Sequence, residues 1–201
     1  MVKAPKIFRV RINPAFHRHR RAAAIVGRIL AAFGELEYII AEAAGKATNN
    51  KETVLRALYR LRATSSRIDL SDTLMRPICM RANLVDEHAT MMDALWHCHK
   101  IRNQFAHCNW GDDSRHPGLF FADLQASAKD DQGFEQRWNH VSVPLLKRQE
   151  DHFVYAQDWI FYVDHELALR VGKLQSHPFP RPTEQALPLC IMTQPDTFLP
   201  G

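Results

Sequence analysis

Reactive side chains are concentrated in one short segment of the chain, between Trp96 and Trp110. Its 15 residues include three histidines, two cysteines and one arginine. An apolar stripe at helical spacing runs through this region and consists of Met91, Ala94, Cys98, Ile101 and Phe105. At about 100° per residue, Arg102 falls at the edge of the stripe, while Asn103 and His107 lie further round the same helix. The segment therefore predicts a buried helix with polar groups along one flank.

An arginine and a histidine near the end of one helix could act together on a phosphate ester. Arginine is always charged, and its fork of N–H donors can hold a phosphate and stabilise the charge of a transition state. Histidine titrates near neutral pH, so it can take a proton from a ribose 2′-hydroxyl or give one to a leaving 5′-oxygen. Arg102 and His107 are therefore candidate catalytic residues.

The run Arg102-Asn103-Gln104-Phe105-Ala106-His107 resembles the R-x4-6-H signature of HEPN domains, in which a polar residue commonly follows the arginine. The resemblance implies a helical bundle that cleaves RNA without a metal ion or other cofactor and leaves a 2′,3′-cyclic phosphate. It implies Arg102, His107 and Asn103 as the catalytic residues. The sequence departs from the usual pattern at Cys108, where that family often has a glycine.

The spacing alone is not specific, because the chain contains four such pairs: Arg11/His17, Arg81/His88, Arg102/His107 and Arg170/His177. The following asparagine, the strong helix and the helix-breaking residues after it favour the third pair. On one helix Arg102 and His107 diverge by about 140°, which is awkward for two groups that must meet at one phosphate. HEPN-like proteins are typically dimers, so we expect a homodimer with a composite site of two Arg102 and two His107 side chains.

Other residues of this region have two interpretations each. His99 could contact the substrate phosphate or act as an auxiliary base, or it could simply face solvent or a neighbouring helix. A zinc site is disfavoured, because His97 and His99 lie about 200° apart on a helix. Trp96 and Trp110 could stack on RNA bases, although packing is the more common role of such residues. Glu35 and Glu37 could approach the motif through bundle packing, or they could be surface charges.

Basic residues are gathered at the start of the chain. The first 34 residues contain eight Lys/Arg and no acidic residue, although the net charge of the whole chain is only +4. Such a basic region could bind RNA phosphates through Arg18, Arg20 and Arg21, or it could be a solvated tail. We list these arginines and His99 as candidate substrate-binding residues.

Composition limits the class of protein. A length of 201 residues with 46% apolar residues fits one globular domain. No apolar run is long enough to span a membrane, and the four cysteines form no C-x-x-C pair. We therefore expect a cytoplasmic protein with no membrane partner. The sequence also has no P-loop, dinucleotide-binding, nucleophile-elbow or H-E-x-x-H motif.

Hydrophobic periodicity predicts a mainly all-α fold, an antiparallel helical bundle with a small β-hairpin insertion before the last helix. We expect residues 1–12 to be a basic arm, 13–176 the bundle with the insertion at about 115–148, and 177–201 a proline-rich tail. Helices are expected at 13–45, from Asn50, at about 70–77, at 83–107 and at 151–175. The expected strands are 119–124 and 134–143, joined by a turn at 129–133.

Two functions follow as alternatives. The first is a HEPN-type endoribonuclease, a toxin restrained by an inhibitory protein partner or a component of phage defence. The second is a non-catalytic dimeric module that holds a protein partner in the same groove.

Overall fold

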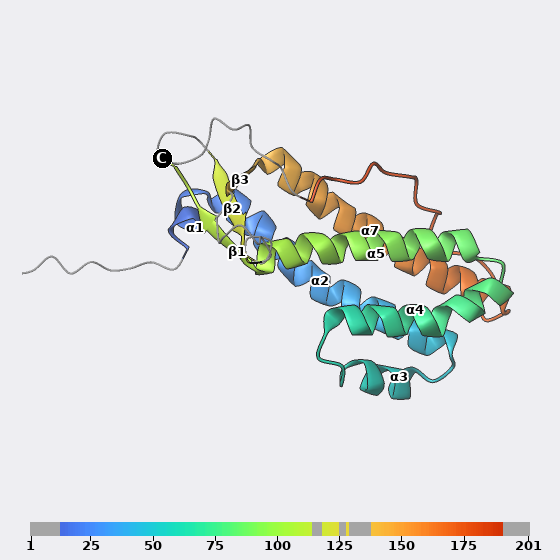
Figure 1. The fold of residues 1–201 in the computed structure, drawn as a ribbon. Coiled ribbons are helices and arrows are strands. Elements are labelled where there is room, and N and C mark those ends of the chain that lie inside the picture. The colour runs from blue at the N-terminus through green and yellow to red at the C-terminus, as the bar shows by residue number, and fades with distance from the viewer. Residues whose placement is uncertain (1–12, 114–117, 125–127, 129–137, 191–201) are drawn as a thin grey trace, which may run out of the picture.

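The computed structural model describes residues 13–113, 118–124, 128 and 138–190. It confirms a mainly helical fold with a small antiparallel sheet. The long helices are α2 (Arg20–Ala47), α4 (Thr64–Arg81), α5 (Val85–Ala106) and α7 (Val143–Arg170), and the short ones are α1 (Pro14–Arg18) and α3 (Lys51–Leu58). Helix α2 packs against α4, α5 and α7. Helix α5 runs in the direction opposite to that of α2, α4 and α7 (Figure 1).

The apolar stripe of α2 accounts for its central place. Five large side chains at helical spacing are fully or almost fully buried: Ile25, Ile29, Phe33, Leu36 and Ile40. The helix expected to begin at Asn13 is interrupted at His19, whose φ of −102° and ψ of 55° are not helical, and this separates α1 from α2. Helix α2 then continues through Gly27 and Gly34 and ends at Ala47, two residues beyond the expected end.

The helix expected at about 70–77 is longer than predicted at both ends. The polar cluster Thr64-Ser65-Ser66, which suggests a helix break, instead begins α4, and Pro77 lies inside α4 instead of ending it. A proline within a helix removes the backbone hydrogen bond to the residue four positions earlier, here Thr73. Pro77 is exposed, so water can reach the carbonyl group that is left without that bond.

Three helices end in the same type of C-cap. The left-handed residues are Asn49 after α2, Asn83 after α4 and Gly172 after α7, with φ of 55°, 54° and 75°. In each case the two N–H groups at and after that residue bond back to the last turn, as in Asn49 N–H to Lys46 O and Asn50 N–H to Gly45 O. These are Schellman motifs, which stop the helix and satisfy its terminal carbonyl groups.

The sheet contains one strand more than expected. Its strands β1 (Cys108–Gly111), β2 (Leu119–Asp123) and β3 (Trp138–Val141) are antiparallel in the order β1-β2-β3. Cys108 is opposite Asp123, and Leu119 is opposite Val141. Strands β2 and β3 correspond to the predicted hairpin, whereas β1 follows α5 directly and was not expected. The predicted turn at 129–133 and the first residues of the second predicted strand lie outside the described residues.

The sheet is joined to the bundle by aromatic packing around Trp110. This side chain is 8% exposed, and its ring lies 5.0 Å from that of Phe16, 5.4 Å from Phe105 and 5.8 Å from Phe121, measured between centroids. The packing interpretation of Trp110 is therefore confirmed. Helix α7 begins at Val143, earlier than expected, where the hydroxyl of Ser142 accepts a hydrogen bond from Leu145 N–H at 3.2 Å.

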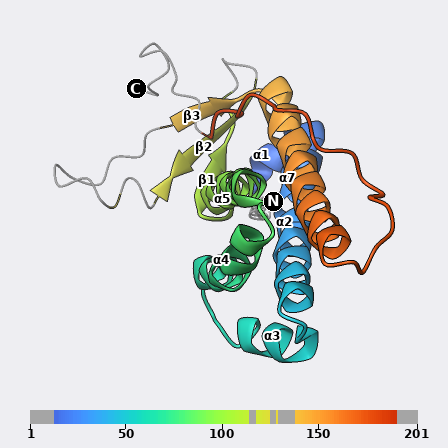
Figure 2. The same cartoon turned by 90° about the vertical axis from the view of Figure 1, so that its right-hand side faces the viewer.

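The segment after α7 has no helix or strand through residue 190, but it is packed against the bundle. It runs back along α7 (Figures 1 and 2), and Pro188 O and Leu189 O accept hydrogen bonds from His97 Nε2 and Gln149 Nε2 at 2.8 and 2.6 Å. Phe179 stacks on Phe161 at 5.4 Å. We call residues 171–190 the C-terminal strap.

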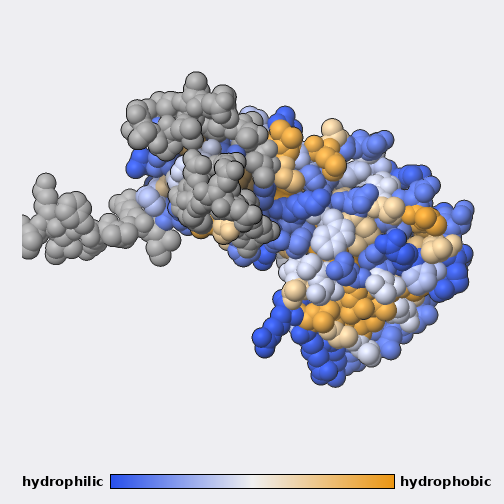
Figure 3. All heavy atoms as spheres, in the orientation of Figure 1, coloured by the Kyte–Doolittle hydropathy of each residue, from blue (hydrophilic) through white to orange (hydrophobic). Residues whose placement is uncertain are grey.

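Beneath the strap lies a row of aromatic side chains on α7, which consists of Tyr155, Trp159 and Tyr162. Tyr155 and Trp159 are buried, Arg181 of the strap lies over the Trp159 ring, and His177 packs on Tyr162. This row is thus a packing surface. The face of the molecule in Figure 3 is mostly hydrophilic, with an apolar patch over α3 and α4. None of the described helices contains a stretch apolar and long enough to cross a membrane.

Candidate functional site

Helix α5 divides the reactive segment between a buried and a polar side. Its buried residues include the whole predicted stripe. His99, Arg102 and Asn103 are half-buried on the flank that faces α2 and α4, whereas Ala106 and His107 are exposed. Three of the predicted site residues therefore share the flank, and His107 is exposed beyond them at the end of the helix.

A hydrogen-bonded chain joins three of the predicted site residues. Arg102 Nη1 donates to Asn103 Oδ1 at 2.9 Å, and Asn103 Nδ2 lies 3.0 Å from His99 Nε2. Because arginine can only donate, it fixes the oxygen of the Asn103 amide toward itself and leaves the NH₂ group to donate to His99. His99 Nε2 must then be an acceptor, which places the proton of the neutral ring on Nδ1.

The electrostatics of His99 agree with this arrangement. Burial lowers the pKa of His99 from its ordinary value, and the charge of Arg102 lowers it further, while Glu37 and Asp69 act weakly in the opposite direction. The imidazole is therefore neutral at pH 7 and can accept from Asn103. Of the two carboxylates considered on α2, Glu37 lies near the motif, whereas Glu35 is exposed beside the groove between α2 and α7.

Aromatic side chains pack against Arg102 and His99 on the side of the core. The guanidinium carbon of Arg102 lies 5.7 Å from the centroid of the Phe33 ring, within the range of a cation–π contact. His99 packs on the same ring at 5.8 Å and meets the edge of Trp96 at 5.3 Å. Trp96 is half-buried and packed against the core, which agrees with a packing role.

Arg102 differs from the other half-buried arginine of the described residues. Arg67 on α4 forms an ion pair with Glu37 of α2 at 2.7 Å, so its charge is compensated. Arg102 forms no ion pair with any residue that the structure describes; its polar partner there is the neutral amide of Asn103. A half-buried cation without a carboxylate is costly unless an anion binds to it.

His107 lies apart from this chain. It caps the C-terminus of α5, where its backbone N–H bonds to Asn103 O at 3.2 Å. Its side chain is exposed and has no hydrogen-bond partner in the described part of the chain. No described hydrogen bond or ring contact joins Arg102 and His107 within one copy, and the spacing along α5 gives their side chains directions about 140° apart.

The predicted basic contacts Arg18, Arg20 and Arg21 lie where α1 meets α2. They line a cavity of about 610 Å³ together with residues of β2, β3 and the start of α7. Arg18 forms an ion pair with Asp112 at 2.8 Å, and all three arginines are exposed. This end of the bundle also holds the C-terminus of α5 (Figure 1). The structure gives no contact between these arginines and Arg102.

His97 and Cys98 of the same segment do not belong to this hydrogen-bonded group. His97 contacts the strap, with Cys190 Sγ 3.6 Å from its Nε2, and Cys98 is fully buried. Burial raises the pKa of the Cys98 thiol. In the described part of the chain, no group of three or more His, Cys, Asp or Glu residues is arranged to hold a metal ion.

Two residues of the surroundings were not found from the sequence. Phe33 was counted as a core residue, and Arg67 fell in a region expected to be a helix break. No motif or spacing connects either of them to Arg102, because the contacts depend on how α2, α4 and α5 pack. No family model matches the chain, and comparisons with curated proteins and with solved structures find no significant match.

Proposed function

We propose that the protein is a metal-independent endoribonuclease of the HEPN type. The observation that carries the proposal is that Arg102 forms no ion pair with a described residue, while Asn103 and Phe33 hold it on a flank that solvent can reach. Asn103 uses only one of the five N–H donors of the guanidinium. The others remain to bind two oxygens of a phosphodiester, which is the anion that a fork of donors fits well.

The reaction needs one proton acceptor, one proton donor and a cation at the phosphate. The ribose 2′-oxygen loses its proton to a neutral imidazole and attacks phosphorus, and the bond to the 5′-oxygen breaks as that oxygen takes a proton from an imidazolium. The products are a 2′,3′-cyclic phosphate and a free 5′-hydroxyl. Arg102 stabilises the charge that builds up on the non-bridging oxygens. No step requires a metal ion.

His107 supplies the proton-transfer group from a second copy of the chain. Within one copy its side chain is exposed and separate from Arg102, as described above. In a homodimer whose α5 C-termini face each other, His107 of one copy can reach the phosphate held by Arg102 of the other. The composite site then contains two Arg102 and two His107 side chains, and Asn103 acts as a positioning residue for Arg102.

The basic residues near α1 extend the same proposal to substrate binding. Arg18, Arg20 and Arg21 lie at the end of the bundle that carries the C-terminus of α5. Their side chains would contact phosphates along the RNA on either side of the cleaved bond, so affinity should weaken steeply as salt is added. His99 keeps Asn103 in place and offers a further polar contact beside the phosphate.

The test is incubation of end-labelled single-stranded RNA with purified protein in EDTA. Arg102→Ala and His107→Ala should each lower cleavage by roughly 100-fold or more, which is the scale of losing a transition-state contact or a general acid–base group. Arg60→Ala is the matched control, because Arg60 is an exposed arginine beyond the end of α3 with no ion pair to a described residue. It should cleave like the original protein.

The other outcomes are equally informative. Cleavage that survives Arg102→Ala would refute the assignment of the site. Equal RNA binding by all variants, with no cleavage by any, would favour the non-catalytic module. If the enzyme is a toxin restrained by an inhibitory partner, its expression alone should arrest growth, and either Arg102→Ala or His107→Ala should relieve the arrest.

A further inference from the structure

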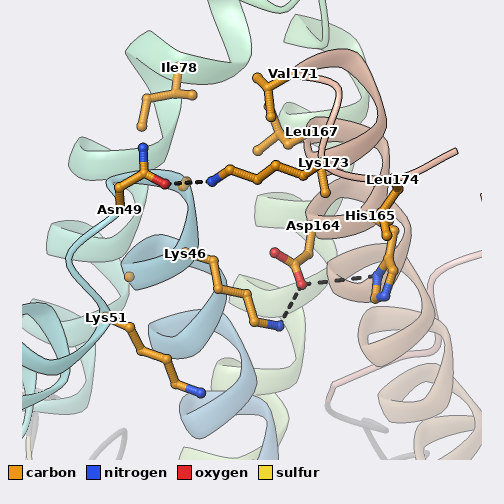
Figure 4. Close-up of a pocket in the computed structure, with 13 residues that line it drawn as sticks. Lys46, Asn49, Lys51, Ile78, Asp164, His165, Leu167, Val171, Lys173 and Leu174 are labelled. Carbon is orange, nitrogen blue, oxygen red and sulfur yellow. Dashed lines mark hydrogen bonds and ion pairs between the residues drawn. The ribbon is translucent and has the colours of Figure 1, made fainter.

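A second candidate site lies at the opposite end of the bundle from the C-terminus of α5 (Figure 1). It is a cavity of about 530 Å³, where α2 and α7 end and α3 begins (Figure 4). Residues of these helices, together with Ile78 of α4, line it. The cavity shares no residue with the Arg102 site, so any ligand that it binds is a separate matter from RNA cleavage.

Two Schellman motifs fix the frame of this cavity. One places Asn49 after α2, and the other places Gly172 and Lys173 after α7, with Lys173 N–H bonded to Ala168 O at 2.8 Å. Lys173 Nζ donates to Asn49 Oδ1 across the opening (Figure 4). Backbone N–H groups already bond the terminal carbonyls in both motifs, so the lysines around the cavity are not needed as helix caps.

One side of the cavity is apolar. Ile78, Leu167, Ala168, Val171 and Leu174 line it. Leu167 is buried, whereas Val171 is 57% exposed at the rim. An apolar wall that remains partly in contact with water favours a ligand with an apolar body, because covering such a wall removes it from water.

The other side carries more cations than anions. Lys46 forms an ion pair with Asp164 at 2.9 Å, and Lys51 bonds to Glu42. The hydrogen bond from Lys51 lowers the pKa of Glu42, so that carboxylate stays ionised. Lys173 has no ion pair with any residue that the structure describes, and its partner is the neutral Asn49 amide. One ammonium group therefore remains uncompensated at the mouth of the cavity.

His165 completes the polar rim without changing this balance. Its Nδ1 lies 2.8 Å from Phe161 O and 4.0 Å from Asp164 Oδ2, while the ring packs on Phe179 of the strap. The ring nitrogen that faces the helix is thus occupied. Among the described residues that line the cavity, Lys173 is thus the cation without an acidic partner.

We infer that this cavity binds a small amphipathic anion, with a compact apolar body against Leu167 and Val171 and a single acidic group on Lys173. The acidic group replaces the Asn49 amide as the partner of the ammonium, and a charge-assisted bond is stronger than the bond to a neutral amide. The volume lies in the range of small-molecule sites. The chemical class is an organic carboxylate, sulfonate or phosphate monoester.

Two fluorescent probes with the same ring skeleton test the two halves of this proposal. 8-Anilinonaphthalene-1-sulfonate has the apolar body and one sulfonate, whereas N-phenyl-1-naphthylamine has the body alone. The full-length protein should bind the sulfonate probe at one site. Lys173→Gln should weaken its binding by roughly three- to tenfold, the range expected for losing a partly exposed charge contact, and should leave the neutral probe unaffected.

Two further variants provide controls. Lys147→Gln removes the same charge from an exposed position elsewhere on α7 and should change neither affinity. Val171→Glu places a carboxylate at the exposed rim of the apolar wall and should weaken both probes. Circular dichroism checks that each variant is folded.

Unchanged affinity of the sulfonate probe in Lys173→Gln would overturn the proposal, and so would equal weakening in Lys147→Gln. Parallel loss of both probes in Lys173→Gln would overturn the role of the ammonium group. Tighter or equal binding by Val171→Glu would place the probe elsewhere. None of these results depends on whether the protein cleaves RNA.

Discussion

The side-chain amide of Asn103 donates to His99 Nε2 at 3.0 Å and accepts from Arg102 through its oxygen at 2.9 Å, so one amide joins the imidazole to the guanidinium. Nε2 accepts a hydrogen bond only while the imidazole is neutral. Protonation of His99 would break the bond, place a second cation beside Arg102 and release the amide that holds the guanidinium. The hydrogen bonds through Asn103 therefore connect the orientation of the Arg102 guanidinium to the protonation state of His99.

We expect RNA cleavage to decline on the acidic side as His99 takes up a proton. Burial and then Arg102 lower the pKa of His99 below the ordinary value of 6.5, so this contribution should appear only in acid. His99→Gln should remove the contribution of His99 to the acidic decline, because a glutamine oxygen can accept from Asn103 at every pH, and should leave the decline that comes from protonation of His107, the proposed proton acceptor. An NMR titration of the His99 ring checks the direction of the shift, and a pKa above 6.5 would contradict the arrangement.

The stability of the fold should fall in mild acid because of His152. Burial lowers the pKa of this 1%-exposed histidine to about 4, and the nearby His97 adds to the effect. Above pH 6.5 both the folded and the unfolded chain carry a neutral ring. Between pH 6.5 and 4 the unfolded chain binds the proton first, so the free energy of unfolding should decrease by roughly 2–3 kcal/mol. Urea unfolding at pH 7 and 4.5 measures the decrease.

His152→Phe is the matched variant for that measurement. It keeps a ring of similar size and removes the titrating nitrogens, so its stability should depend less on pH over the same interval. It should lose little stability at pH 7, because neither buried ring nitrogen of His152 has a hydrogen bond of good geometry to a described residue, and the backbone of Ala94 raises its pKa only as the smallest of the three effects. An equal pH dependence in the variant would assign the effect to other groups.

A mixture of two inactive variants tests the composite site. A dimer formed from one Arg102→Ala copy and one His107→Ala copy retains one Arg102 and one His107 on opposite copies. If the two groups act across the interface, mixing the variants after partial unfolding and refolding should raise cleavage above that of either variant alone, because about half of the dimers are mixed and each of these has one Arg102 and one His107 on opposite copies. Cleavage should stay well below that of the original protein, because the composite site of the unmodified dimer has two of each. No recovery, with mixed dimers demonstrated by mass spectrometry, would exclude catalysis across the interface.

Two glycines should respond to alanine in opposite directions. Gly118 has φ of +141°, and a Cβ at this position would lie 2.1 Å from His140 Nε2. Gly118→Ala should destabilise the fold by about 1–3 kcal/mol. Gly27 lies inside α2 with no neighbour near the added methyl group, so Gly27→Ala should stabilise it by about 0.5–1 kcal/mol. Thermal unfolding of both variants gives the comparison.

Local patterns were sufficient to predict where most of the long helices lie and which side of α5 is buried. The 3.6-residue period predicted helices at 13–45, 83–107 and 151–175, which correspond to α2, α5 and α7 apart from their ends, because one face of each helix packs on the others. Asn103 and His99 are four residues apart, a spacing at which side chains of one helix can touch. The same geometry predicts that Arg102 and His107 diverge on one helix.

The features that were missed depend on contacts between distant segments. Proline favours the end of a helix, so Pro77 predicts an end there. Helix α4 nevertheless continues past it, and the flanking Met75 and Cys79 are buried in the core. Strand β1 is only four residues long and pairs with β2, which begins at Leu119, so no alternating pattern reveals it. The pairing of Arg67 with Glu37 likewise exists only because α4 lies beside α2.

His97 and His99 are two residues apart, yet they leave α5 on different sides, one toward the strap and the other toward Asn103. One helix therefore carries both the contact with the strap and the residues of the candidate site. A rotation of its last turns would weaken the hydrogen bond from His97 to Pro188 O and change the direction of the Arg102 guanidinium. A molecule that displaced the strap from His97 would therefore change the surroundings of the helix that carries Arg102 without contacting His99, Arg102 or Asn103.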